Sequence, residues 1–100
     1  MEKRLYTRFK VDVPVSFTGD ASGTGAIYNL GMGGCKLFSR TGVAQGAILK
    51  LHLSLPAPLS PITIRVAIVR WVMGQEFGSE FLGIQESEGE RLAEFLRTIR

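Results

Sequence analysis

Apolar and polar residues alternate along much of this chain, and the alternation predicts β-strands. The clearest example is 48–55, where polar residues separate four leucines: Leu49, Leu51, Leu53 and Leu55. A helix would scatter these leucines around its circumference, whereas a strand places all four on one face, against a core. The segment 10–17 shows the same period. Pro14 within it indicates an edge or a bulge, because proline has no backbone N–H to donate to a neighbouring strand.

The pattern predicts further strands at 24–30, 35–39, 62–73 and 76–84. One face of the longest is expected to hold Ile62, Ile64, Val66 and Ile68. The opposite face is also apolar towards the end of that strand, at Ala67, Val69 and Trp71. Burial on both faces is typical of a covered strand, so we expect the last helix or a partner to lie over the outer face.

The apolar period becomes helical near the end of the chain. A single stripe there consists of Leu92, Phe95, Leu96 and Ile99. Ser87 and Glu90 match a capping box, which predicts that Ser87 caps a helix over 87–99. Six short strands followed by one helix predict a mainly-β fold, an antiparallel barrel with a helix across it. We divide this single domain into a flexible basic arm (1–9), a barrel (10–84) and the helix (87–99).

The charge balance favours an anionic partner. The chain carries a formal net charge of +3. Most of the excess lies at the start, where Lys3, Arg4, Arg8 and Lys10 oppose only Glu2. Such a local basic arm is more informative than the whole-chain balance.

Other bulk features point to the cytoplasm. Cys35 is the single cysteine, so no intramolecular disulfide can form. No apolar run approaches the ~20 residues that cross a bilayer, and the charged N-terminus does not have the form of a secretory signal. We therefore expect a cytoplasmic location without membrane insertion.

Catalytic residues are scarce. His52 is the only histidine, and it falls on the polar side of an alternating strand. Neither a nucleophile elbow nor a phosphate-binding glycine loop occurs in the sequence, and Cys35 has no second cysteine or histidine with which to share a metal besides His52. We predict that the protein is not an enzyme and uses neither a metal nor a cofactor.

Two features favour binding instead. The stretch 28–35 contains Gly31, Gly33 and Gly34, which permit a close approach of the backbone, and Asn29 at its edge offers a short amide. Arg4 and Arg8, spaced four apart, present guanidinium groups that suit phosphates or the O6/N7 edge of guanine. Each feature alone is also compatible with a plain hairpin or a solvated tail.

Together, these features resemble the PilZ domain family, the bacterial receptor modules for cyclic di-GMP. The family pattern is R-x-x-x-R in an N-terminal arm and [D/N]-x-S-x-x-G at a hairpin. Here these segments read Arg4-Leu5-Tyr6-Thr7-Arg8 and Asn29-Leu30-Gly31-Met32-Gly33-Gly34. The later segments Arg70-Trp71 and Phe77-Gly78-Ser79-Glu80-Phe81 also look like the family's late strands. The resemblance covers nearly the whole chain and implies a PilZ-like split barrel with six antiparallel strands and a C-terminal helix.

The resemblance also implies a ligand site. Arg4 and Arg8 would grip the phosphates and guanine edges of cyclic di-GMP, and Asn29 would hydrogen-bond a guanine. Gly34 would allow the turn. A further basic residue before the first arginine, here Lys3, favours an intercalated ligand dimer in relatives.

One position departs from the pattern, because Gly31 stands where the family has a serine. Loss of that hydroxyl would cost about 1 kcal/mol of binding, or severalfold in affinity. Asn29 also has a single carbonyl, which cannot accept two guanine N–H bonds as an aspartate does.

We therefore expect a cyclic di-GMP receptor that regulates an unidentified protein partner, as a monomer or weak dimer. Its arm would be mobile when empty and would fold over the ligand. The alternative is a degenerate PilZ adaptor that binds nucleotide weakly or not at all, with an exposed apolar patch around Phe38, Trp71 and Met73. A barrel for single-stranded nucleic acid is less favoured, because only Phe38 lies near basic residues, Lys36 and Arg40; we expect no nucleic acid partner.

Overall fold

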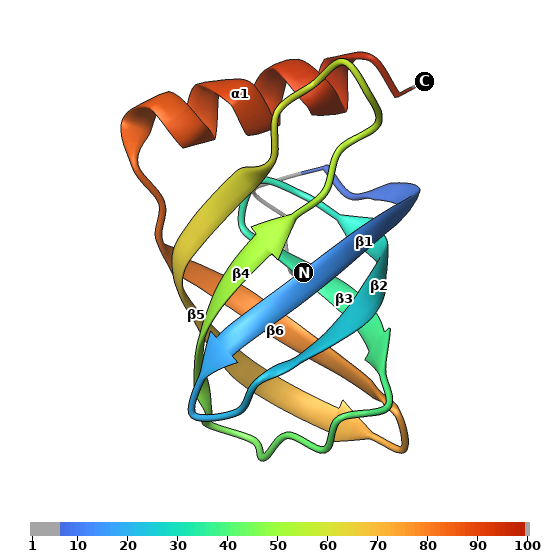
Figure 1. The fold of residues 1–100 in the computed structure, drawn as a ribbon, viewed down its shortest axis with the longest axis vertical. Helices are drawn as coiled ribbons and strands as arrows, with labels where there is room; N and C mark the ends of the chain where they lie inside the picture. The colour runs from blue at the N-terminus through green and yellow to red at the C-terminus, as the bar shows by residue number, and fades with distance from the viewer. Residues whose placement is uncertain (1–6, 100) are drawn as a thin grey trace, which may run out of the picture.

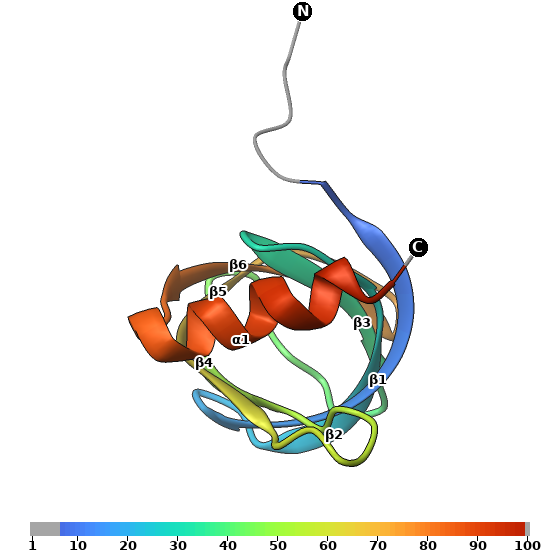
Figure 2. The ribbon, with the colours of Figure 1, turned by 90° about the horizontal axis from the view of Figure 1, so that it is seen from above.

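A closed six-stranded antiparallel barrel forms the body of the protein in the computed structural model, which describes residues 7–99 (Figure 1). The strands are β1 (Phe9–Gly19), β2 (Gly23–Leu30), β3 (Gly34–Ser39), β4 (Ile48–Leu53), β5 (Ile62–Met73) and β6 (Glu76–Gly83). Their order around the barrel is β1-β2-β3-β6-β5-β4. The chain then enters α1 (Glu86–Arg97), which lies across one end of the barrel (Figure 2). The predicted fold class is confirmed.

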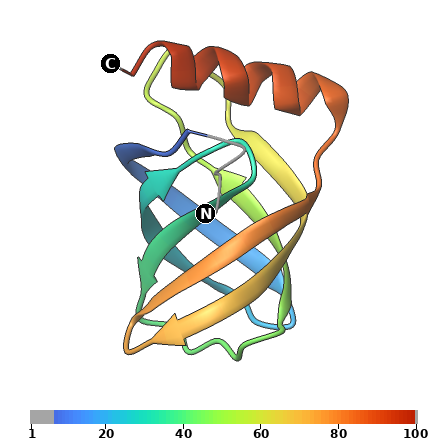
Figure 3. The same ribbon diagram turned by 180° about the vertical axis from the view of Figure 1, so that it is seen from behind.

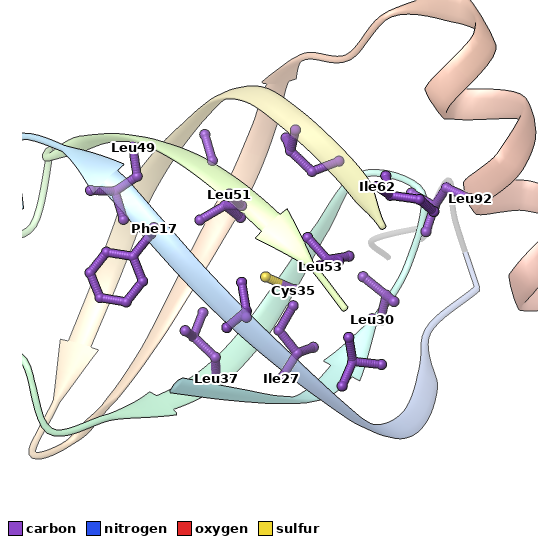
Figure 4. Packing of buried hydrophobic residues seen from close by; sticks show 14 of the residues in the cluster. Phe17, Ile27, Leu30, Cys35, Leu37, Leu49, Leu51, Leu53, Ile62 and Leu92 are labelled. Carbon is purple, nitrogen blue, oxygen red and sulfur yellow. The ribbon is translucent and has the colours of Figure 1, made fainter. Parts of the chain in front are cut away.

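Alternating residues of the strands fill the barrel (Figure 4). The fully enclosed side chains include Val13, Phe17, Leu49, Leu51 and Leu53. The rings of Phe17 and Phe77 meet edge to face, with centroids 5.8 Å apart. β4 ends at Leu53, earlier than predicted, and Leu55 packs against the core only in part. Where each strand is regular, the period of two therefore identifies the core correctly.

A bulge in β5 overturns part of the predicted pattern. Along β5 the pairing with β4 skips from Ile64 to Ala67, while β4 advances by only two residues. A bulge of this kind adds a residue to one strand and reverses the faces beyond it. Ala67 is therefore buried, and Val66 is 36% exposed. The prediction that Val66 and Ile68 continue the inward face is wrong.

β1 carries an irregularity close to Pro14. Its register against β2 shifts between Lys10 and Val13, whereas Pro14 itself pairs regularly with Ala26. β1 lies between β2 and β4, so it is not an edge strand. Of the two readings that proline allowed, the bulge is the closer, although it precedes Pro14.

The outer face of β5 is not covered by α1. The helix lies at the end of the barrel where β5 begins (Figures 1 and 3). Trp71 is close to the last residue of that strand, Met73, and so lies towards its other end. The indole instead rests on β6, where a Cβ on Gly78 would fall 2.1 Å from Trp71 Nε1. The expectation of a helical cover was therefore wrong, and a glycine provides the space for the ring.

The capping box was also predicted wrongly. Gln85 is the N-cap, in extended conformation and without a side-chain capping bond, so Ser87 already lies inside the helix. The predicted stripe does face the barrel, since Leu92, Phe95 and Leu96 are buried. Within residues 7–99, no helix has the length and apolar character needed to span a membrane.

Candidate functional site

The end of the arm and the glycine-rich turn meet through one hydrogen bond. Arg8 Nη1 donates to Asn29 Oδ1 over 3.0 Å, across 21 residues of sequence. The antiparallel pairing of β1 with β2 explains the meeting, because it sets Phe9 opposite Leu30 and Lys10 opposite Asn29. Arg8 immediately precedes β1, so it reaches the β2–β3 turn at the same end of the barrel.

Asn29 owes its orientation to a bulge in β2. The register of β2 against β3 shifts between Ile27 and Asn29, so that Asn29 pairs with Lys36. Ile27 and Leu30 are both fully buried although they are three residues apart. The extra residue lets Asn29 point outward while Leu30 still reaches the core. Bulges often aim a side chain in this way next to functional sites.

The turn itself is tight and crowded. Gly31 N donates to Gly34 O over 2.9 Å, and both glycines are buried. A Cβ on Gly34 would lie 2.5 Å from Ser79 O, on the neighbouring strand β6. Neither glycine has a positive φ. The turn therefore needs glycine at position 34 because β6 passes too close for a side chain.

Arg8 and Asn29 together form a surface of hydrogen-bond donors. A guanidinium has only donors, so the Asn29 acceptor Oδ1 faces Arg8 and the Nδ2 amide group is left to bind elsewhere. The remaining N–H groups of Arg8 are also donors. Such a surface suits ligand acceptors, including phosphate oxygens and the O6/N7 edge of guanine.

Two lysines flank Asn29. Lys10 of β1 and Lys36 of β3 both pair with Asn29, one on each side. Residues directly opposite on paired strands share a face, so both lysines lie on the outer face with the amide. With Arg8, they place three basic side chains around Asn29, which favours an anionic ligand. Lys36 was predicted only as a weak nucleic-acid feature; the signal missed was its register with Asn29.

Cys35 lies under the site but is not available to it. The thiol is fully enclosed, and its sulfur lies 3.4 Å from Ser79 Oγ. Burial raises the pKa of Cys35 to about 11, against the smaller lowering effects of the Ser79 hydrogen bond and the Arg8 charge. Cys35 is therefore a core residue with a neutral thiol, and the groups available to a ligand are those on the outer face of the barrel.

The predicted site residues divide into two groups. Arg8, Asn29, Gly31 and Gly34 converge on the β2–β3 turn. Lys3 and Arg4 lie outside the described residues. Thr7 was not predicted, yet its carbonyl oxygen lies 2.9 Å from the place of a Cβ on Gly31. This contact uses a backbone oxygen, which every residue has, so the amino-acid sequence gives no signal of it.

His52 takes no part in the site. Its Nδ1 lies 3.2 Å from Thr63 Oγ1, between β4 and β5, on the other side of the barrel from the β2–β3 turn. Over residues 7–99, no three His, Cys, Asp or Glu side chains gather to hold a metal ion.

Comparison with known proteins agrees with this fold. A family model described as the PilZ domain matches residues 2–98. A solved structure described as the Bacillus subtilis inhibitor of motility (MotI/DgrA) is similar, with a TM-score of 0.82 and 20% identity over 98% of this chain. The match covers 51% of that protein, so the chain spans about half its length, and the likeness shows the fold. No curated protein matches the sequence.

Proposed function

The chain belongs to the PilZ domain family, whose members include bacterial receptors for cyclic di-GMP, and we propose that it binds this ligand and acts as a switch without catalysis. The observation that carries the proposal is the hydrogen bond from Arg8 to Asn29, which joins the arm motif to the turn motif. Two parts of one family pattern, 21 residues apart, therefore form one surface.

Each residue has a role in the proposed complex. Arg8 donates to a phosphate or to the O6/N7 edge of a guanine, and the Asn29 amide donates to a second acceptor. Gly34 allows the turn to lie close against β6. Lys10 and Lys36 supply further positive charge beside Asn29. Arg4 and Lys3 lie outside the described residues; in the proposal, Arg4 also donates to the phosphates or guanine edges of the ligand, and Lys3 adds charge.

The proposed output is regulation of a protein partner. In this proposal the ligand binds Arg4 as well as Arg8, so that it joins the basic arm to the barrel and creates a new surface at that end of the molecule. The similar solved structure is named as an inhibitor of motility, which supports a regulatory output by analogy.

Isothermal titration calorimetry with cyclic di-GMP tests the proposal. We expect binding below ~100 μM, and at least about tenfold weaker binding for R8A and for R4A, because each loses a charge-assisted contact. R65A is the matched control, since Arg65 is an exposed arginine on β5, away from the turn. Absence of heat for the parent protein would overturn the receptor proposal, and unchanged affinity for R8A would remove Arg8 from the site.

An adaptor function is the second candidate, because apolar side chains are exposed on the outer face. Phe38 is 48% exposed and Met73 is 72% exposed, and both pair with Glu76. The rings of Phe38 and Tyr28 lie next to each other, with centroids 4.7 Å apart. A partner captured equally with and without nucleotide, and lost in F38S, would favour the adaptor over the switch.

A further inference from the structure

Gly31 lies directly beneath Thr7 and Arg8, in the part of the arm that the structure describes. A Cβ at this position would fall 2.9 Å from Thr7 O and 3.2 Å from Arg8 Cδ, with Arg8 Nε next at 3.6 Å. All three atoms belong to the two described residues that precede β1. A real Cβ does not approach a backbone oxygen to 2.9 Å, so with any other residue at position 31 either Thr7 or the turn would have to shift.

The backbone of the turn does not itself require glycine at position 31. Gly31 has no positive φ, and its hydrogen bond to Gly34 O uses a backbone N–H that other residues also have. Apart from its two chain neighbours, the three atoms nearest to a Cβ on Gly31 all belong to Thr7 and Arg8. This separates Gly31 from Gly34, whose Cβ would meet Ser79 O of β6.

We propose that Gly31 is a positioning residue that allows Thr7 and Arg8 to pack on the turn, so that Arg8 and Asn29 are already joined before any ligand arrives. This packing holds the side chain of Arg8 in place. Arg8 in turn orients the Asn29 amide, so that the Nδ2 donors of Asn29 point outward. Resting on the proposed function, the consequence is that half of the cyclic di-GMP site is preorganised. The ligand then does not have to order Arg8 on binding, and this compensates in part for the hydroxyl that glycine lacks.

The first test needs no nucleotide. In G31A the added methyl group lifts Thr7 and Arg8 from the turn, and we expect trypsin to cleave after Arg8 about threefold to tenfold faster than in the parent protein. Cleavage after Arg65, within β5, is the internal measure of global unfolding and stays unchanged. G42A is the matched control, because a Cβ on Gly42 meets nothing within 4 Å. Equal rates of cleavage after Arg8 in G31A and in the parent would overturn the proposal that Gly31 positions Arg8.

The second test asks whether Gly31 acts through Arg8. We expect G31A to weaken cyclic di-GMP binding by about threefold to tenfold, the cost of immobilising one long side chain. In an R8A background the same glycine change should have no effect, because the side chain to be held is gone. Additive losses in R8A/G31A would show that Gly31 acts independently of Arg8 and would overturn the proposal.

The two tests distinguish the failure of this inference from that of the proposed function. If G31A is cleaved faster but the protein does not bind cyclic di-GMP, the positioning role of Gly31 is supported and only the receptor function is refuted. If the parent protein binds cyclic di-GMP and G31A shows the same cleavage and the same affinity, the receptor function is supported and the positioning role of Gly31 is refuted.

Discussion

At the scale of single residues, Asn29 shows how one atom defines the edge that a site recognises. An aspartate at this position would offer two acceptors, whereas Asn29 has one carbonyl oxygen, and Arg8 already donates to it. The amide N–H groups are left for the ligand. The sequence suggested that Asn29 is a weaker acceptor for guanine N–H groups; the geometry adds that this side chain is better placed to donate to guanine or phosphate acceptors.

Cys35 gives a prediction at the same scale. Its pKa is raised to about 11 by burial, and its side chain is 1% exposed, so the reactive thiolate is scarce at pH 8. We expect Ellman's reagent to modify native protein roughly a hundredfold or more slowly than protein unfolded in guanidinium. The signal is unambiguous because the chain has a single cysteine. Rapid, complete reaction in native buffer would contradict the enclosed position of the thiol.

At the scale of elements, α1 is tied to the barrel by polar contacts as well as by its apolar stripe. Thr63 N donates to Glu88 Oε1 over 2.8 Å, which joins the first turn of α1 to β5. Arg91 Nη1 donates to Glu88 Oε2 and to Pro61 O, each over 2.9 Å, and Arg91 Nη2 also donates to Ser60 O. Glu88 and Arg91 thus bind the helix to the segment that leads into β5.

This polar tie makes the docking of α1 sensitive to acid. The hydrogen bond from Thr63, followed by the Arg91 interactions, holds the pKa of Glu88 below its ordinary value of 4.5, although burial opposes this. A carboxylate with a lowered pKa stabilises the fold above the pKa of the unfolded chain, and the contribution is lost as pH falls through the folded-state pKa. We expect E88Q to lower the free energy of unfolding by about 1 kcal/mol at pH 7.

Urea unfolding at a series of pH values measures this effect. The gap between E88Q and the parent should close as pH falls below 4.5. E94Q is the control: Glu94 pairs with Arg97 on the surface and is 70% exposed, so its loss should change stability by less than about 0.5 kcal/mol. A gap for E88Q that persists unchanged at pH 3 would mean that shape, rather than charge, determines its role.

The elements also show what the sequence can and cannot predict. Alternation predicted the six strands and their inward residues wherever the register is regular, as at Leu49, Leu51 and Leu53. It failed at Val66, because a bulge depends on the partner strand and leaves no mark in the period. The cap was misplaced because the helix begins after Gln85, which makes no side-chain capping bond, so the local motif at Ser87 is not used as a cap.

The candidate site was predictable to a similar degree. The motif residues Arg8, Asn29 and Gly34 stood out in the sequence, and the structure brings them together at one turn. The contributions of Lys10 and Lys36 depend on their common pairing with Asn29, which is set by strand register. Contacts of this kind follow from the fold and not from residue spacing along the chain.

At the scale of the whole molecule, the turn, the start of β1 and α1 all lie at one end of the barrel (Figures 1 and 2). Leu30 follows Asn29 directly and is fully buried, and Leu92 of α1 is buried in the same apolar cluster (Figure 4). The proposed ligand site and the helix therefore share one continuous core. The hairpin between β5 and β6 and the connection from β3 to β4 lie at the other end.

This arrangement predicts where a ligand changes backbone dynamics. On addition of cyclic di-GMP we expect amide hydrogen exchange to slow at 7–10 and 29–35, because these backbones form the site. A smaller slowing should appear in α1, since Leu30 of the turn and Leu92 of the helix belong to the same apolar cluster. Exchange at 40–46 and around Gly74 should not change, because those loops lie at the far end.

R8A under the same nucleotide concentration is the control and should show little slowing anywhere. Protection confined to the far end would place the ligand away from Arg8 and Asn29, and protection at the turn without any change in α1 would restrict the output surface to the arm and the outer face of β2 and β3.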